Sequence, residues 1–139
     1  MHKLLAAFQQ FFRENSEHWV ERFEYKEAGP QLLLQAFLHR IVNGGGRIDR
    51  EYGLGRGRTD LMVFWGDQRE VLELKVAKDA VGTAKAVTEG VGQISGYMDR
   101  AGVNEGHLIV FERGNRSWDE KIFHREESSG GRRIQVWGM

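Results

Sequence analysis

The residues best suited to chemistry are two acids and a lysine in the middle of the chain, Asp60, Glu73 and Lys75. Side chains two positions apart on a strand point to the same face, so Glu73 and Lys75 project together. A hairpin between their strand and the preceding one would bring the carboxylate of Asp60 beside Glu73. Two converging carboxylates form a site for a hard cation such as Mg²⁺, and a lysine beside the metal can hold a phosphate or stabilise a metal-bound hydroxide.

An acid and a lysine two residues apart more often form an ordinary surface ion pair. Here the surrounding sequence is hydrophobic, with Val71 before Glu73 and with Met62 and Phe64 after Asp60. A half-buried acidic cluster needs a cation or a proton to be stable. The context therefore favours a metal site over a solvated ion pair.

A second pair of polar residues, Gln93 and Tyr97, is spaced four apart, so both lie on one face of an expected helix. That helix also contains Gly90, Gly92 and Gly96. Each glycine costs a helix about 1 kcal/mol relative to alanine. Three of them indicate a close approach, either to a strand or to a phosphate backbone, and the sequence leaves both readings open.

Periodicity and turn signals place helices in the N-terminal part of the chain. Residues 4–12 carry an apolar stripe, and Asn15-Ser16 is a candidate cap for a second short helix with Trp19, Val20 and Phe23. A third helix is expected over residues 30–42, where Pro30 suits a first turn. The glycines after Asn43 end it.

The middle and the end of the chain predict strands around one further helix. Three strands joined by short turns should form an antiparallel meander, followed by a helix, a fourth strand and a terminal hairpin. The expected ranges are strands 47–54, 58–65 and 69–76, helix 84–101, strand 106–112, and a hairpin of 121–125 and 133–137 with a turn at 128–131.

The order of Asp60, Glu73 and Lys75, followed by Gln93 and Tyr97 on a helix, resembles the PD-(D/E)XK nuclease superfamily, in particular its branch with a Q-x-x-x-Y helix. D…E-x-K alone is a weak motif, and the helix pair with the strand order makes it more specific. Three segments, residues 55–61, 71–76 and 106–111, together resemble nuclease domains at the C-terminus of bacterial and archaeal AAA-ATPase-like proteins. The resemblance covers about residues 24–112 and the last four residues, and Thr59 stands where the motif has proline.

The resemblance implies an α/β fold with a restriction-endonuclease-like core. This core would be a central mixed four-stranded sheet flanked by helices, with an N-terminal helix and a C-terminal hairpin added. The whole chain, 1–139, would be one nuclease-like domain on which residues 1–25 pack. The implied activity is phosphodiester hydrolysis dependent on Mg²⁺ or Mn²⁺.

The resemblance also implies a role for each motif residue. Asp60 and Glu73 would bind the metal, Lys75 would act on the water and the phosphate, and Gln93 and Tyr97 would orient the site. Members often add an acid from the first helix; Glu27 is the candidate and Glu51 its rival. The expected nucleic-acid-binding residues are Arg56, Arg58 and Lys78; a solvated strand and turn is the alternative for the two arginines.

Composition limits how the protein could bind nucleic acid and which other classes of protein it could belong to. The formal net charge is +0, so contact with nucleic acid, for which we expect DNA, must come from a local patch. No apolar run approaches the roughly 20 residues of a membrane span, and the absence of cysteine fits a reducing cytoplasm, where we expect the protein. The five histidines show no ligand spacing, so the sequence does not predict a zinc site.

Two alternatives to an active nuclease stay open. The first is a catalytically inactive nuclease fold that binds DNA or a partner protein. The second is an assembly module, in which the aromatic N-terminal segment packs on an ATPase domain of a longer chain or on another copy in a homodimer. The simpler role of that segment is a helix covering the sheet. The intact set of Asp60, Glu73 and Lys75 favours the active nuclease.

Overall fold

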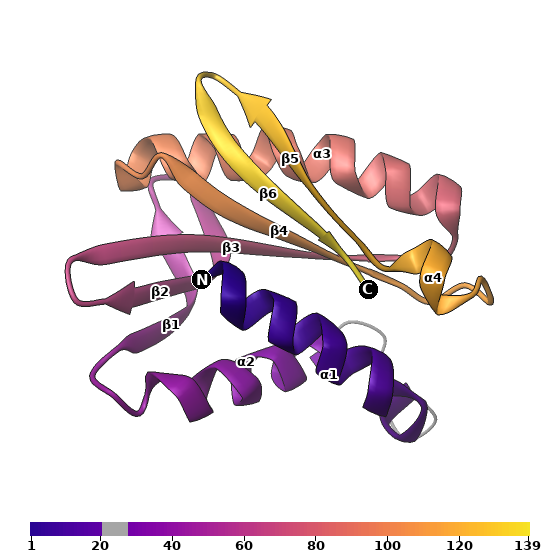
Figure 1. The fold of residues 1–139 in the computed structure, drawn as a ribbon. Helices are drawn as coiled ribbons and strands as arrows, with labels where there is room; N and C mark the ends of the chain where they lie inside the picture. Colours follow the sequence, from indigo (N-terminus) through magenta and orange to yellow (C-terminus); the bar gives the residue numbers. More distant parts are fainter. Residues whose placement is uncertain (21–27) are drawn as a thin grey trace.

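The computed structural model describes the backbone of residues 1–20 and 28–139, with side chains for residues 1–15, 29–39 and 43–139. Its centre is one mixed sheet with helices on both faces (Figure 1). Helix α3 (Ala80–Ala101) covers one face, and α1 (His2–Val20) and α2 (Ala28–Val42) cover the other. The α/β class expected from the sequence is therefore correct.

The sheet has six strands in the order β1-β2-β3-β4-β6-β5. Their bounds are β1 Arg47–Leu54, β2 Gly57–Trp65, β3 Gln68–Ala77, β4 Glu105–Glu112, β5 Phe123–Ser129 and β6 Arg132–Gly138. The first three pair antiparallel as a meander, which confirms the expectation. β3 and β4 are parallel, which requires the long connection that α3 provides.

The expected four-stranded sheet with a separate hairpin is wrong in one respect. β6 pairs in parallel with β4, and β5 pairs antiparallel with β6, so the hairpin extends the same sheet. Val136 and Trp137 are buried, and a strand whose apolar residues need cover on both faces gains more from joining the sheet than from standing apart.

The N-terminal segment forms one helix where the sequence predicted two. The side-chain amide of Asn15 donates to the carbonyl oxygen of Phe11 at 2.9 Å, a bond inside the helix rather than a cap. Leu5, Phe8 and Phe12 form one buried stripe against the sheet, as their helical spacing predicts. Phe23 lies outside the described residues.

Two other boundaries differ because of local capping. Helix α3 begins four residues before the expected start, since the side chain of Asp79 accepts from the N–H of Gly82 at 2.8 Å. Residues 118–121 form a short helix, α4 (Trp118–Lys121), whose last residue, Lys121, is where the sequence predicted a strand to start. A capping box between Ser117 and Glu120 favours that helical turn, and β5 then starts at Phe123.

Strand alternation divides the interior into two cores. The residues that face α3 include Met62, Val71 and Ala77, whereas Leu72 and Leu74 face α1 and α2. Glu73 and Lys75 lie between Val71 and Ala77 in the same parity, so they are polar positions on the α3 face. The fold therefore places the two predicted functional residues directly beneath the helix that carries Gln93 and Tyr97.

The glycines of α3 have different surroundings. A Cβ on buried Gly90 would lie 2.6 Å from a methyl carbon of Leu108, so this glycine allows the helix to approach β4 closely. A Cβ on Gly92 or Gly96 would meet nothing within 4 Å. The close-packing interpretation is thus correct for one glycine of the three.

Among the described residues, no helix is both long and apolar enough to cross a membrane.

Candidate active site

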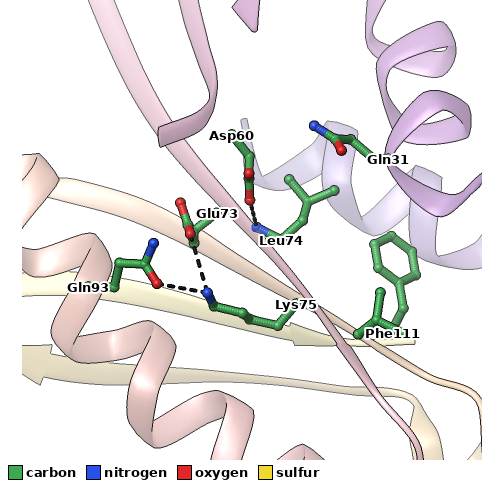
Figure 2. Close-up of a pocket in the computed structure, with 8 residues that line it drawn as sticks. Gln31, Asp60, Glu73, Leu74, Lys75, Gln93 and Phe111 are labelled. Carbon is green, nitrogen blue, oxygen red and sulfur yellow. Dashed lines mark hydrogen bonds and ion pairs between the residues drawn. The ribbon is translucent and has the colours of Figure 1, made fainter. Parts of the chain in front are cut away.

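A pocket of about 370 Å³ opens where β2 separates from β3 (Figure 2). The β2–β3 pairing ends with Leu61 opposite Leu72, and the next residues outward are Asp60 and Glu73. The pocket is lined by Gln31, Asp60, Glu73, Leu74, Lys75, Val76, Gln93 and Phe111. Four of the five residues expected to be catalytic therefore lie around one cavity.

Asp60 is held at the point of separation by a backbone contact. Its Oδ2 accepts a hydrogen bond from the N–H of Leu74 at 2.7 Å. β2 no longer pairs with β3 there, so the carboxylate takes the place of a strand carbonyl as the acceptor. This bond fixes the side chain beside the strand that carries Glu73 and Lys75.

Glu73 is the most deeply buried acid of the pocket, with only 2% of its surface exposed. Burial raises the pKa of its carboxyl, the negative charge of Asp60 raises it further, and Lys75 opposes both; the result is a pKa of about 7. Its Oε2 atom is buried and has no hydrogen-bond partner among the described residues. A buried oxygen in this condition is costly unless a proton or a cation reaches it.

Lys75 is held between the strand and the helix. Its Nζ donates to Oε1 of Gln93 at 2.7 Å and lies 3.5 Å from Oε1 of Glu73. The side-chain amide of Gln93 in turn donates to the hydroxyl of Tyr97 at 3.0 Å. The chain of contacts from Glu73 through Lys75 to Gln93 thus ends at Tyr97.

Tyr97 is buried and does not line the pocket. A Cβ on Gly57 would lie 2.7 Å from Cε1 of Tyr97, so the start of β2 passes the ring at a distance that only glycine permits. The contact fixes the position of the hydroxyl that Gln93 uses. Tyr97 is therefore linked to the pocket through the hydrogen bond between its hydroxyl and Gln93.

The donor set of the pocket suits a hard divalent cation. Two carboxylates, Asp60 and Glu73, offer oxygen ligands, and Mg²⁺ or Mn²⁺ is commonly held by one or two carboxylates with waters completing the shell. The unpartnered Oε2 of Glu73 is the observation that fits such an ion. A cation there would also offset the repulsion that raises the pKa of Glu73.

Two residues were candidates for a further acidic metal ligand, Glu27 and Glu51. Glu27 lies outside the described residues. Its rival Glu51 lies on β1, exposed, 3.4 Å from Nη1 of Arg58, and it is not part of the pocket lining. Glu51 therefore belongs to a surface ion pair in this structure.

The three basic residues expected to bind nucleic acid are exposed and do not line the pocket. Arg56 lies in the β1–β2 turn, Arg58 near the start of β2, and Lys78 directly after β3. β2 and β3 run antiparallel, so all three lie toward the same end of the sheet. Arg58 is already engaged with Glu51, whereas Arg56 and Lys78 extend from loops.

Gln31 is a pocket residue that sequence reasoning missed. It lies in α2, and its side chain reaches the pocket from the face opposite α3 (Figure 2). The only signal in the sequence was its position four residues after Glu27, the acid that the resemblance offered. Leu74, Val76 and Phe111 form an apolar wall on the same side.

Comparison of the chain with models of protein families, with curated proteins and with solved structures finds no match.

Proposed function

We propose that this chain is a metal-dependent nuclease that hydrolyses phosphodiester bonds of nucleic acid, with DNA as the first substrate to test. The single observation that carries the proposal is the state of Glu73. Its Oε2 is buried without a partner, next to Asp60 and with the ammonium group of Lys75 3.5 Å from its other oxygen. Together with the resemblance of the motif order to PD-(D/E)XK nucleases, this geometry favours phosphodiester chemistry.

Asp60 and Glu73 would hold the metal ion, which would supply positive charge at the phosphate and lower the pKa of a bound water. Asp60 enters this role already oriented, because the N–H of Leu74 fixes one of its oxygens. Without metal the pKa of Glu73 is about 7, so positive charge close to its carboxyl would favour loss of the proton. Metal binding and ionisation of Glu73 are therefore coupled in the proposed site.

Lys75 would place a positive charge on the scissile phosphate. Its Nζ donates to Gln93 as well as lying near Glu73, and the bond to Gln93 keeps the ammonium group from moving closer to the Glu73 carboxylate. A donor held in advance in a partly buried site stabilises developing charge better than a mobile one. Gln93 and Tyr97 therefore support the reaction by holding the lysine, without touching the reacting atoms.

The exposed basic residues at one end of the sheet would bind the rest of the substrate backbone. They are Arg56, Arg58 and Lys78. Their number is small and the chain has a formal net charge of +0, so nonspecific affinity for nucleic acid should be modest. We propose that substrate delivery is shared with another component, such as an ATPase domain of a longer chain or a second copy of this one.

The experiment is a cleavage assay with supercoiled plasmid, single-stranded circular DNA and RNA, each with Mg²⁺ or Mn²⁺ and with a chelator. We expect metal-dependent cleavage that is lost in Asp60→Asn, Glu73→Gln and Lys75→Ala. Matched controls are Glu89→Gln and Lys85→Ala, an acid and a lysine exposed together on α3, which should cut like the wild type.

Three results would count against an active nuclease in different ways. Activity that survives equally in Asp60→Asn would show that the cleavage comes from a contaminant. Saturable Mn²⁺ binding with no cleavage of any of the three substrates would favour the inactive nuclease fold. Absence of both metal binding and cleavage would reject the proposal.

A further inference from the structure

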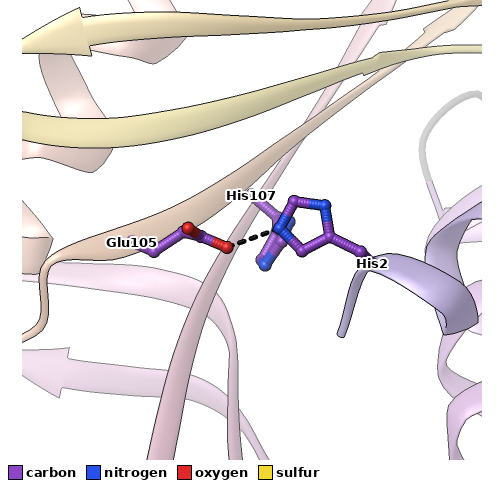
Figure 3. A group of neighbouring side chains, drawn as sticks. All are labelled: His2, Glu105 and His107. Atoms are coloured by element: carbon purple, nitrogen blue, oxygen red, sulfur yellow. Dashed lines mark hydrogen bonds and ion pairs between the residues drawn. The ribbon is translucent and has the colours of Figure 1, made fainter.

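A second group of possible metal ligands lies on the face of the sheet that α1 and α2 cover, and none of its residues lines the pocket. It consists of His2 at the start of α1 and of Glu105 and His107 on β4 (Figure 3). One ligand atom from each residue lies within 4.8 Å of the other two. Glu105 and His107 are two positions apart on a strand and so share a face, and the helix brings His2 to them from a distance of more than 100 residues.

Each of these side chains already has a polar contact. Nε2 of His2 lies 2.5 Å from Oε1 of Glu105, whose other oxygen lies 2.9 Å from Nη2 of Arg133. Nε2 of His107 lies 3.3 Å from Oε2 of Glu70 on the neighbouring strand. The cluster therefore contains two imidazoles and a second carboxylate nearby, with the arginine holding the first carboxylate in place.

We propose that His2, Glu105 and His107 form a binding site for a transition-metal ion of the Zn²⁺ class, with Glu70 as the nearest further oxygen ligand. Imidazole nitrogen and carboxylate oxygen are the donors that Zn²⁺ takes in proteins, whereas Mg²⁺ prefers oxygen alone. The two sites of this chain thus differ in the metal they select. The contact of Arg133 with Glu105 supplies the outer support that metal-bound carboxylates usually have.

Binding requires one rearrangement around His107. The indole N–H of Trp137 donates to its Nδ1 at 3.3 Å, which keeps the proton of the neutral ring on Nε2, facing Glu70. Coordination through Nε2 moves that proton to Nδ1, so the bond from Trp137 must break. The free energy lost with that hydrogen bond is small compared with the free energy gained when a structural zinc ion binds.

His2 is the ligand that would adjust its position to complete the coordination geometry. Its side chain is 45% exposed, while that of His107 is fully buried, so His2 is the ligand free to adjust. A metal ion there would join the start of α1 to β4. It would bind the folded chain and not the unfolded one, and would raise the melting temperature by an amount that grows with the logarithm of the ion concentration divided by Kd.

His107 pairs across strands with Leu72, so the two side chains share a face of the sheet. Glu73, the next residue after Leu72, projects to the opposite face. The two metal sites can therefore be separated by mutation. The test uses the double variant Asp60→Asn/Glu73→Gln, which lacks the carboxylates of the pocket, prepared without a histidine tag. Any tight Zn²⁺ binding that remains in this variant must come from elsewhere in the chain.

Calorimetry with Zn²⁺ should show one saturable site in the double variant, and Zn²⁺ should raise its melting temperature. Adding His2→Gln should weaken Zn²⁺ binding at least tenfold and remove the thermal shift. Adding His39→Gln instead, an exposed histidine on α2, is the matched control and should change neither. Co²⁺ in place of Zn²⁺ should give the visible absorption of a tetrahedral nitrogen and oxygen site.

His107 is tested without being mutated, because a change at a fully buried ring could unfold the chain. The ¹⁵N resonances of its imidazole should shift on adding Zn²⁺ to the double variant, with the proton moving from Nε2 to Nδ1. The proposal is overturned if the double variant shows no saturable Zn²⁺ binding at about 100 µM. It is equally overturned if His2→Gln leaves binding unchanged, or if the His107 resonances do not respond. None of these outcomes bears on cleavage at the pocket.

Discussion

Oδ2 of Asp60 accepts the backbone N–H of Leu74 at 2.7 Å, at the position where β2 stops pairing with β3. The same carboxylate that we propose as a metal ligand therefore also completes the hydrogen bonding of a strand. Separation of the strands opens the pocket, and the Asp60 side chain satisfies the backbone that this separation would leave unpaired. Asp60 thus stabilises the fold and is also a proposed metal ligand.

This double role predicts different effects for two substitutions of Asp60. Asp60→Ala removes the acceptor and leaves the N–H of Leu74 without a partner, which should cost about 1–3 kcal/mol of unfolding free energy. Asp60→Asn keeps an oxygen that can accept, so it should cost less than half as much. Both should abolish Mn²⁺ binding at the pocket. Urea denaturation and calorimetry check the two effects, and equal stability losses in both variants would contradict the structural role.

The raised pKa of Glu73 predicts how stability depends on pH without metal. In the folded chain Glu73 keeps its proton up to about pH 7, against an ordinary value of 4.5. Its contribution to stability is therefore full below pH 4.5, falls as pH rises toward 7, and is lost above 7. The shift corresponds to about 3 kcal/mol at about 1.4 kcal/mol for each pH unit.

Glu73→Gln lacks this ionisation. We expect the variant to gain stability over the wild type between pH 4.5 and pH 7.5, and the gain to level off above that range. Saturating Mg²⁺ at pH 7.5 should reduce the difference, because the ion stabilises the ionised wild-type carboxylate and not the amide. Denaturation series at several pH values measure this; a difference that stays constant with pH would mean that Glu73 is ionised throughout.

The contact between Lys75 and Gln93 predicts an effect on rate rather than on metal binding. Gln93→Ala removes the acceptor 2.7 Å from Nζ, and the ammonium can then move toward Glu73. We expect a loss of about tenfold in kcat with the Mn²⁺ affinity nearly unchanged, against about 100-fold or more for Lys75→Ala. Tyr97→Phe, which deletes only the hydroxyl that holds Gln93, should fall between Gln93→Ala and the wild type. A larger loss in Tyr97→Phe than in Gln93→Ala would contradict the order of contacts.

The glycines of α3 predict a contrast within one helix. Gly92→Ala and Gly96→Ala place a methyl group in open space, so each should stabilise the chain by up to about 1 kcal/mol. Gly90→Ala should lose this gain and destabilise the chain, since its Cβ would lie 2.6 Å from the buried side chain of Leu108. Melting temperatures of the three variants check the contrast. If Gly90→Ala were as stable as the other two variants, α3 would not pack closely on β4 at this position.

The sequence by itself determined the parts of this protein that depend on local patterns. Alternation placed Glu73 and Lys75 on one face of a strand, and the spacing of Gln93 and Tyr97 placed both on one side of a helix. The meander followed from three apolar runs separated by short turns, and the structure has it. These features need only the neighbours of each residue along the chain.

Tertiary structure decided everything that depends on which distant segments meet. The position of Gln31 four residues after Glu27 did not by itself show that α2 reaches the pocket, and no histidine spacing placed His2 beside His107. Both contacts are made by packing between distant segments. The hairpin joined the sheet through β4, since buried strands pair where apolar cover is available on both faces. The unpartnered oxygen of Glu73 is likewise a property of the folded interior: the sequence supplies the carboxylate, and only burial makes it need a cation.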